Sequence, residues 1–338
     1  MNIRVNLGIN SYDIIIERGI IKKVSEELNL KRKVFIITDD GVPKQYSRII
    51  ADQCMEAHIF SVLQGEESKS IKTYEMLLSK MLSLGFDRTD CVVAVGGGVV
   101  GDLSGFVASS YMRGIDFYNI PTTVLSQIDS SIGGKVAVNL DGIKNIVGAF
   151  YQPKKVLIDP DVLSTLDSRQ VSNGLSEAVK MSLTSDAELF SIFENEDAMS
   201  NIETIIEKSL CVKKKVVEED EKEKGLRKVL NFGHTIGHGV EAQKELGLYH
   251  GESVALGMIP MCSESVRARL LKVLSKLSLP TGANLDAESV MSAIRHDKKA
   301  KGDFVTAVYV ENVGTFSFKD IDVKSLKSDI EKLSERSR

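Results

Sequence analysis

Short apolar runs alternate with helical patterns through the first half of this chain. Residues 33–38 (KVFIIT), 91–95 (CVVAV) and 117–120 (FYNI) have the length and composition of buried strands, and turn-forming residues follow each run. Residues 71–84 and 103–111 carry apolar side chains at helical spacing. Because parallel strands need crossover segments between them, this alternation predicts a parallel sheet covered by helices.

The pattern changes near residue 160, after which strand signals are few. The second half predicts helices over residues 174–183, 202–217, 231–246, 252–274 and 323–334. A length of 338 residues suits two domains of roughly 150 residues each. The sequence therefore predicts an α/β domain over residues 1–159 and a mostly α-helical domain over residues 160–338.

Composition restricts the partners of this protein. The 43 basic and 47 acidic residues give a formal charge of −4, so no basic excess indicates nucleic acid or a membrane surface as a partner. The longest apolar runs fall short of the ~18 residues of a membrane-spanning helix, and the first residues lack the pattern of a signal peptide. Four scattered cysteines suit reduced thiols, and we expect a cytoplasmic location.

A glycine-rich turn follows the second predicted strand. Residues 96–102 (GGGVVGD) fit the spacing G-x-G-x-x-G between a strand and a helix, where glycines let the backbone approach a diphosphate at a helix N-terminus. A tight turn without a ligand is the alternative. A ribose acceptor is expected near such a turn, and both Asp39, at the end of the preceding strand, and Asp116 qualify.

A second motif combines glycines with lysines. Residues 129–135 (DSSIGGK) are followed by Lys144 and Asn145, and two glycines beside a lysine are typical of a phosphate or carboxylate cradle. The spacing differs from the P-loop pattern G-x-x-x-x-G-K. A glycine-rich surface loop with a solvated lysine is therefore an equally good interpretation of this motif.

A third group contains three of the five histidines and one glutamate. His234 and His238 are four residues apart and share one helical face, a spacing that favours them as a zinc-binding pair. Glu177 shares a face with Lys180, and His250 follows nearby. Packing histidines on an amphipathic helix are the alternative, because the sequence HTIGH lacks the glutamate of the H-E-x-x-H motif.

These motifs occur together with others in one order along the chain. They are GGGVVGD (96–102), YMRG (111–114), PTT (121–123), DSSIGGK (129–135), KN (144–145), GAFYQP (148–153), LNFGHTIGH (230–238) and HGE (250–252). In this order the chain resembles the 3-dehydroquinate synthase family of the sugar phosphate cyclase superfamily. The resemblance implies a Rossmann-like NAD-binding domain over residues 1–159 and a helical metal- and substrate-binding domain over residues 160–338, with the active site in the cleft between them.

The resemblance also implies an activity, cofactors and an assembly. Members of this family are lyases of the shikimate pathway of aromatic amino acid biosynthesis, and they convert 3-deoxy-D-arabino-heptulosonate 7-phosphate into 3-dehydroquinate and phosphate. The implied reaction combines transient oxidation by NAD, phosphate elimination, reduction and aldol cyclisation. The implied cofactors are NAD and a divalent metal, zinc or cobalt, and the implied assembly is a homodimer.

Matching motifs assign the site residues by resemblance. The implied metal ligands are Glu177, His234 and His250, in place of the pair that spacing favours, and His238 becomes a substrate or proton-relay contact. The implied NAD contacts are Asp39, Glu66, Lys69, Gly97, Gly98, Val99, Asp102, Thr122, Thr123, Lys144 and Thr165. The implied substrate-binding and organising residues are Asp129, Lys135, Asn145, Lys180, Lys213, Arg227, Asn231, one of Lys298 and Lys299, and the partner subunit's Arg113.

Three other functions stay open on the sequence alone. Another sugar phosphate cyclase would keep the NAD and metal residues and differ in the groups that bind the substrate carboxylate. An NAD- and metal-dependent polyol dehydrogenase would not need phosphate-binding cations, and a dinucleotide-binding sensor without activity would not need metal ligands. The predicted contacts Lys213, Arg227 and Asn231 favour dehydroquinate formation, because phosphate and carboxylate groups both need cations or amide donors.

Overall fold

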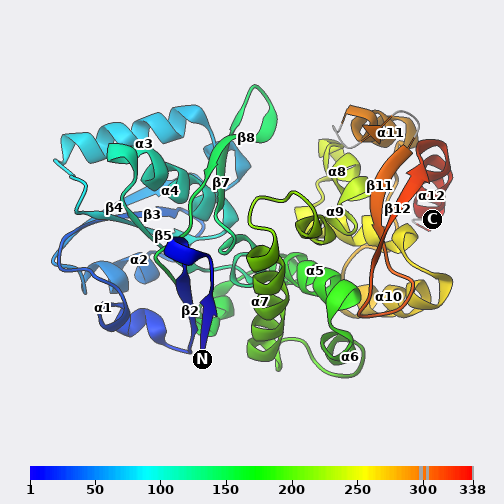
Figure 1. The fold of residues 1–338 in the computed structure, drawn as a ribbon, viewed down its shortest axis with the longest axis horizontal. Helices are drawn as coiled ribbons and strands as arrows, with labels where there is room; N and C mark the ends of the chain where they lie inside the picture. The colour runs from blue at the N-terminus through cyan, green and yellow to red at the C-terminus, as the bar shows by residue number, and fades with distance from the viewer. Residues whose placement is uncertain (297–299, 302–303, 337–338) are drawn as a thin grey trace. The chain divides into compact units, whose positions relative to one another are not determined.

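The computed structural model of this chain describes residues 1–296, 300–301 and 304–336, and it forms two compact units, Met1–Leu166 and Asp167–Arg338 (Figure 1). The border predicted from the sequence lies between residues 159 and 160. The first unit instead includes the 3₁₀ helix η6 (Pro160–Thr165). This helix is held in the first unit because the Tyr46 hydroxyl donates to the Val162 carbonyl at 3.3 Å and contacts Thr165 Oγ1 at 3.0 Å.

A seven-stranded sheet in the order β1-β2-β9-β6-β5-β3-β4 forms the centre of the first unit. Its neighbouring strands are parallel except for β1 and β2, so the predicted parallel sheet is confirmed, with one antiparallel strand at its edge. The strands are β1 (Asn2–Val5), β2 (Tyr12–Ile16), β3 (Lys33–Asp39), β4 (Glu56–Val62), β5 (Cys91–Gly96), β6 (Asp116–Pro121) and β9 (Lys155–Ile158).

Helices cover both faces of this sheet (Figure 1). Along β3, Val34 and Ile36 pack in one apolar cluster with α1 and α2, and Phe35 and Ile37 pack in a second cluster with α3 and α4, because successive strand side chains point to opposite faces. The helices are α1 (Val24–Glu27), α2 (Lys44–Ala51), α3 (Ile71–Ser83) and α4 (Gly98–Ser110). Short helical turns are η1 (Gly8–Asn10), η2 (Ile20–Lys23), η3 (Glu66–Ser68), η4 (Tyr111–Arg113) and the π-turn η5 (Ser126–Ser130).

The DSSIGGK motif leads into a two-stranded hairpin of β7 (Lys135–Leu140) and β8 (Ile143–Phe150). Gly133 and Gly134 have φ angles of +91° and +65°, which L side chains rarely adopt. A side chain at Gly134 would also overlap that of Gln152. The second glycine of the motif is therefore required by the turn itself, and Lys135 begins a strand.

The second unit is mostly helical, and no helix in the part of the chain that the structure describes is long and apolar enough to span a membrane. Its α-helices are α5 (Ser168–Ser185), α6 (Ala187–Asn195), α7 (Ile202–Glu219), α8 (His234–Glu241), α9 (His250–Met258), α10 (Glu264–Lys276), α11 (Ala287–His296) and α12 (Val323–Glu335). Its 3₁₀ helices are η7 (Leu226–Asn231), η8 (Lys244–Leu246) and η9 (Ile259–Met261).

Two features of the second unit differ from the sequence analysis. A small antiparallel sheet of β10 (Ala300–Lys301), β11 (Phe304–Tyr309) and β12 (Ser317–Asp322) was not predicted. The segment 252–274, predicted as one helix, is divided at η9, where Pro260 cannot continue the α-helical hydrogen bonding. The segment 231–246 is likewise shorter than predicted, because α8 starts only after Gly233 in a left-handed conformation.

The four cysteines differ in exposure, and this gives a first testable prediction. Burial raises the pKa of Cys54 to about 11 and the pKa values of Cys91 and Cys262 to about 12. Burial also raises the pKa of Cys211, but of the four cysteines only Cys211 has an exposed side chain. Only thiolates react with Ellman's reagent, so at about pH 8 we expect one fast thiol per native chain. All four should react after denaturation. A fast thiol that persists in the Cys211→Ser variant would contradict this assignment.

Candidate functional site

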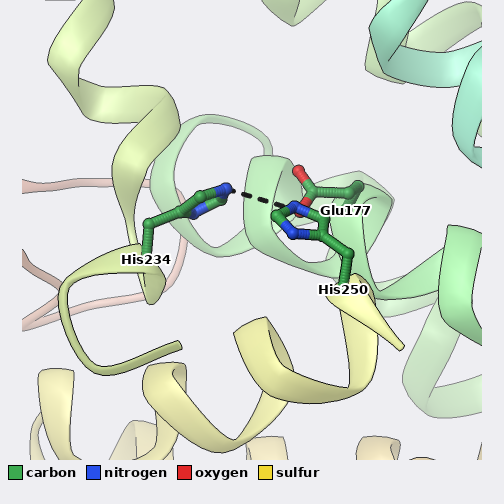
Figure 2. Close-up of side chains that lie close together, drawn as sticks. All are labelled: Glu177, His234 and His250. Carbon is green, nitrogen blue, oxygen red and sulfur yellow. Dashed lines mark ion pairs between the residues drawn. The ribbon is translucent and has the colours of Figure 1, made fainter. Parts of the chain in front are cut away.

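Glu177, His234 and His250 converge in the second unit. Glu177 lies in the middle of α5, and the two histidines are the first residues of α8 and α9. Figure 2 shows their side chains pointing toward one another, and one ligand atom from each lies within 4.8 Å of the others. The Nε2 atoms of His250 and His234 are 3.6 and 3.9 Å from Glu177 Oε1.

Glycines bring the three helices close enough for this convergence. A side chain at Gly251 would overlap the Asn173 carbonyl oxygen, so α9 lies directly against α5. A side chain at Gly257 would overlap the Gly233 carbonyl oxygen, so α9 also lies directly against the start of α8. Gly251 of the HGE motif and Gly257, seven residues after His250, are therefore needed to place the histidines beside Glu177.

Hydrogen bonds orient both imidazoles. His250 Nδ1 donates to Glu241 Oε2 at 3.0 Å, and His234 Nδ1 donates to the Phe232 carbonyl at 3.2 Å, which leaves both Nε2 atoms facing Glu177. A carboxylate behind a histidine is a common arrangement at metal sites, where it fixes the tautomer. The sequence analysis did not identify Glu241. It lies three residues after His238 and seven after His234, and this helical spacing is the signal that could have found it.

Charge is concentrated at this buried position. The side chains of Glu177 and Lys180 form an ion pair and are 1% and 3% exposed. Burial alone would raise the pKa of Glu177, but Lys180 and the two histidines hold that pKa well below its usual value. Burial and Lys180 lower the pKa of His234, whereas the carboxylates of Glu177 and Glu241 outweigh burial and raise the pKa of His250 to about 10. Without metal, Glu177 is therefore a carboxylate and His234 a neutral imidazole, as metal ligands must be, whereas His250 is protonated and releases its proton when a metal binds.

This donor set fits a divalent metal. Two imidazoles and one carboxylate are typical of catalytic zinc sites, which keep a further position open. Glu177 Oε1 is buried, yet both facing nitrogens lie beyond hydrogen-bond distance, so a cation among the three ligand atoms would satisfy it.

The pair that helical spacing favoured is not the group that the structure brings together. The His238 ring lies 5.1 Å from the His234 ring and 6.2 Å from the His250 ring, between centroids. Within residues 1–296, 300–301 and 304–336, the one group of potential ligands is Glu177, His234 and His250. His238 is therefore adjacent to that group and not part of it.

Two further predicted substrate-binding cations of the second unit are buried, in addition to Lys180. Lys213 on α7 and Arg227 on η7 are 5% and 3% exposed, which is rare for charged side chains. Arg227 Nη1 donates to the Glu221 carbonyl at 2.5 Å, and Asn231 Nδ2 donates to Glu223 Oε1 at 3.0 Å. The predicted contacts Lys298 and Lys299 lie outside the described residues.

The glycine-rich turn of the first unit lies between β5 and α4. Side chains at Gly97 and Gly98 would come within 3.2 Å of Thr123 and 3.1 Å of Ser130. An α-helix leaves its first N–H groups without intrahelical acceptors, so the start of α4 offers hydrogen-bond donors to an anion. The glycines leave space there for the anion to approach the backbone. These residues fit the diphosphate of a dinucleotide. Thr122 lies at the same end of the sheet, because its N–H donates to the Gly96 carbonyl at 2.9 Å.

The structure distinguishes between the two candidate ribose acceptors. Asp39 is the last residue of β3, at the carboxyl ends of the parallel strands, where the glycine turn also lies. Asp116 is the first residue of β6, at the opposite ends of the strands, and it pairs with Arg32 at 2.8 Å. Asp39 accepts hydrogen bonds from the backbone of Gly41 at 2.9 Å, and burial raises its pKa. Of the two, Asp39 lies on the side of the glycine turn and Asp116 does not.

A polar cluster joins several other predicted residues of the first unit. The Lys69 ammonium pairs with Asp102 and donates to Asn145 Oδ1, and Glu66 Oε1 accepts from Asn139 Nδ2 at 2.8 Å. Asn139 was not identified from the sequence. The remaining predicted residues are Val99 in the first turn of α4, Asp129 in η5, Thr165 beside Tyr46, and the exposed Arg113, Lys135 and Lys144.

Family models match most of the chain. The 3-dehydroquinate synthase N-terminal model matches residues 59–173, and the C-terminal model of the same family matches residues 174–300. The chain belongs to the 3-dehydroquinate synthase family. Its 3-dehydroquinate synthase relatives include those of Streptococcus thermophilus, 41% identical over 98% of this chain and 100% of the relative, and of Streptococcus mutans, 40% identical over the same shares.

Solved structures agree with membership of the 3-dehydroquinate synthase family. A 2-deoxy-scyllo-inosose synthase complexed with carbaglucose-6-phosphate, NAD+ and Co2+ is 27% identical, with a TM-score of 0.90 over 98% of this chain and 99% of that one. The 2-epi-5-epi-valiolone synthase of Streptomyces hygroscopicus, with NAD+ and Zn2+ bound, is 27% identical, with a TM-score of 0.87 over 96% and 97% of the chains. A probable glycerol dehydrogenase, 16% identical, shares the fold.

The carboxylate behind His250 gives a second prediction. We expect Glu241→Gln to raise the dissociation constant of the metal by about 10- to 100-fold, because the neutral amide no longer supplies the negative charge that fixes the His250 tautomer and raises the basicity of that ligand. Competition with a chromogenic chelator measures that constant. Glu245→Gln, an exposed change just beyond the same helix, is the matched control and should leave it unchanged. Equal affinity in the Glu241 and Glu245 variants would show that Glu241 has no part in metal binding.

Proposed function

We propose that this enzyme is a phosphate-eliminating lyase that converts 3-deoxy-D-arabino-heptulosonate 7-phosphate into 3-dehydroquinate and phosphate, the shikimate-pathway step of its relatives. The observation that carries the proposal is the convergence of Glu177, His234 and His250 in a chain that 3-dehydroquinate synthase models match from residue 59 to residue 300. A metal site of this composition serves substrate hydroxyls rather than structure, because it leaves a coordination position open.

Two cofactors complete the proposal, NAD at the glycine turn of the first unit and zinc or cobalt at the three ligands of the second. When bound, NAD supplies a hydride acceptor that is regenerated in each turnover. The metal, when bound, supplies a Lewis acid that makes substrate hydroxyls more acidic. Two structural relatives have been solved with NAD+ and either Co2+ or Zn2+, which supports both assignments.

The remaining proposed roles follow from charge and position. Lys213, Arg227 and Asn231, with Lys135 and Asn145 of the hairpin, bind the phosphate and carboxylate ends of the substrate, and Lys180 keeps Glu177 ionised. His238 moves protons beside the metal ligands, and Asp129 organises the site through hydrogen bonds. The exposed Arg113 contacts the phosphate from the partner subunit of a homodimer. We also propose a cytoplasmic location.

The main alternative is a different sugar phosphate cyclase. Such enzymes act on other sugar phosphates with the same cofactor residues, so the metal site alone does not separate them. The sequence identity to 3-dehydroquinate synthases, 41%, exceeds the 27% to the two other cyclases. An NAD-dependent polyol dehydrogenase is less well supported, because the likeness to a probable glycerol dehydrogenase is one of fold.

One assay tests the proposal. Purified enzyme is incubated with the heptulosonate phosphate, excess Zn²⁺ or Co²⁺ and substoichiometric NAD, and both phosphate release and the product are measured. We expect many phosphates per NAD and 3-dehydroquinate as the product, because the hydride returns in each cycle. Net accumulation of NADH on a polyol would instead identify a dehydrogenase. Turnover of glucose 6-phosphate in place of the heptulosonate would identify another cyclase.

A further inference from the structure

A cavity of 810 Å³ lies within the second unit, away from the residues assigned to the metal and the substrate. It is bounded by α7, η7, the end of α5 and the loop 314–316. The Gly314 N–H donates to the Leu183 carbonyl at 2.8 Å and so fixes this loop against α5. The volume is within the range of roughly 300–1,000 Å³ that is typical of small-molecule sites.

The cavity and the side chain of Lys213, the proposed substrate contact, lie on opposite sides of helix α7. Cys211 and Lys215 both line the cavity, and each is two residues from Lys213. Residues two apart on an α-helix lie about 200° apart around its axis. Lys213 therefore projects from the side of α7 opposite the cavity, and the cavity is distinct from the site described above.

The lining combines an apolar surface with five charged residues, which are Asp186, Glu207, Lys208, Lys215 and Glu219. The apolar part consists of Val212, Val216, Leu226, Val229 and Phe316. Lys208 is already paired with Asp186 at 3.2 Å and Glu188 at 3.0 Å, so it is not available to a ligand.

The other lysine and one carboxylate remain available at the rim. The exposed side chains of Lys215 and Glu219, one helical turn apart, form no ion pair or hydrogen bond with the residues that the structure describes. Lysine before glutamate is also the less favourable order for a pair within a helix. A cation and an anion about 6 Å apart along α7, beside an apolar surface, match a molecule that carries both charges and a large apolar group.

We propose that this cavity is a second small-molecule site, which binds a zwitterion of amino-acid size with a large apolar side chain. Lys215 binds the ligand carboxylate, Glu219 binds the ammonium group, and the apolar lining takes the side chain. Leu226 and Val229 of η7 line the cavity, and Arg227 and Asn231 lie on the same short helix. Occupancy of the cavity therefore changes the position of these residues and the affinity for substrate, a consequence that rests on the proposed function.

The exposed thiol of Cys211 reports occupancy without any assay of activity. The holoenzyme is titrated with L-phenylalanine, and the rate at which Ellman's reagent modifies Cys211 is measured together with saturation-transfer NMR of the ligand. Phenethylamine and 3-phenylpropionate, which each lack one charge, are the matched probes. We expect L-phenylalanine to slow modification by at least fivefold, and each probe to bind at least about tenfold more weakly, because each loses one charge-assisted contact.

Variants test the assignment of the charges. Lys215→Ala should weaken L-phenylalanine binding by about tenfold, and it should leave kcat without the ligand unchanged. The control is Lys222→Ala, which removes an exposed lysine outside the cavity and should bind as the wild type does. No protection of Cys211 at millimolar L-phenylalanine, or equal binding of all three probes, would overturn the proposal. If binding is seen but no phosphate is released from the heptulosonate phosphate, the proposed function fails and the second site stands.

Discussion

Replacing His250 by alanine is expected to lower metal-dependent turnover by at least about 100-fold. Losing a residue that only hydrogen-bonds a metal ligand costs up to about 100-fold, and losing the ligand itself should cost at least as much. The variant loses one of three ligands, and the carboxylate of Glu241 loses the imidazole that it orients. The loss should persist at saturating substrate, because a missing ligand removes the Lewis acid rather than weakening substrate binding. Metal content by mass spectrometry and phosphate release, measured on one preparation, check the prediction.

The control for this experiment is His58→Ala. His58 lies on β4 in the first unit, where it contacts Glu56 at 2.9 Å and has no neighbour among the three ligands. This variant should keep metal content and turnover, and both variants should bind NAD as the wild type does, because the glycine turn is in the other unit. A His250→Ala protein with a full complement of metal would show that the ligand assignment is wrong.

The sequence could identify the histidines but not their grouping. Helical spacing describes only contacts within one helix, and on that basis it favoured His234 with His238. The observed group needs α9 to lie directly against both α5 and the start of α8, which depends on the absence of side chains at Gly251 and Gly257. Such long-range contacts have no local signature. Resemblance to the family named the same three residues, because it carries this tertiary information.

The fold shows the same difference between local and long-range signals. The strands β3, β5 and β6 are continuous apolar runs and were predicted within one residue of each end. Strand β12 (SFKDID) is largely exposed and polar, so it has no apolar period, and only its pairing with β11 defines it. Glu241 was missed for a related reason, since one glutamate at the end of a helix is not distinctive until His250 is seen beside it.

Lys180→Met is expected to lower the free energy of unfolding of the metal-free second unit by about 3–5 kcal/mol, because it leaves the Glu177 carboxylate buried without its cation. The pH dependence has a definite sign. In the wild type the lowered pKa of Glu177 adds stability above the ordinary carboxyl pKa of about 4.3, and this stability is lost as the pH falls. In the variant only the histidines still oppose burial, so that pKa is higher than in the wild type, and protonation relieves the penalty. The difference between the two proteins should therefore be largest near neutral pH and narrow in acid.

A double-mutant cycle separates the ion pair from packing. Glu177→Gln/Lys180→Met removes both charges and should regain most of the stability that Lys180→Met loses, because no buried charge is left unpaired. Lys272→Met, an exposed change on α10 of the same unit, is the matched control and should alter stability by less than about 0.5 kcal/mol. The cycle also includes Glu177→Gln alone, and denaturant unfolding in the presence of a chelator measures all five proteins. If the two substitutions are simply additive, the Lys180 side chain stabilises the unit through its methylene packing, and Glu177 is neutralised by the histidines instead.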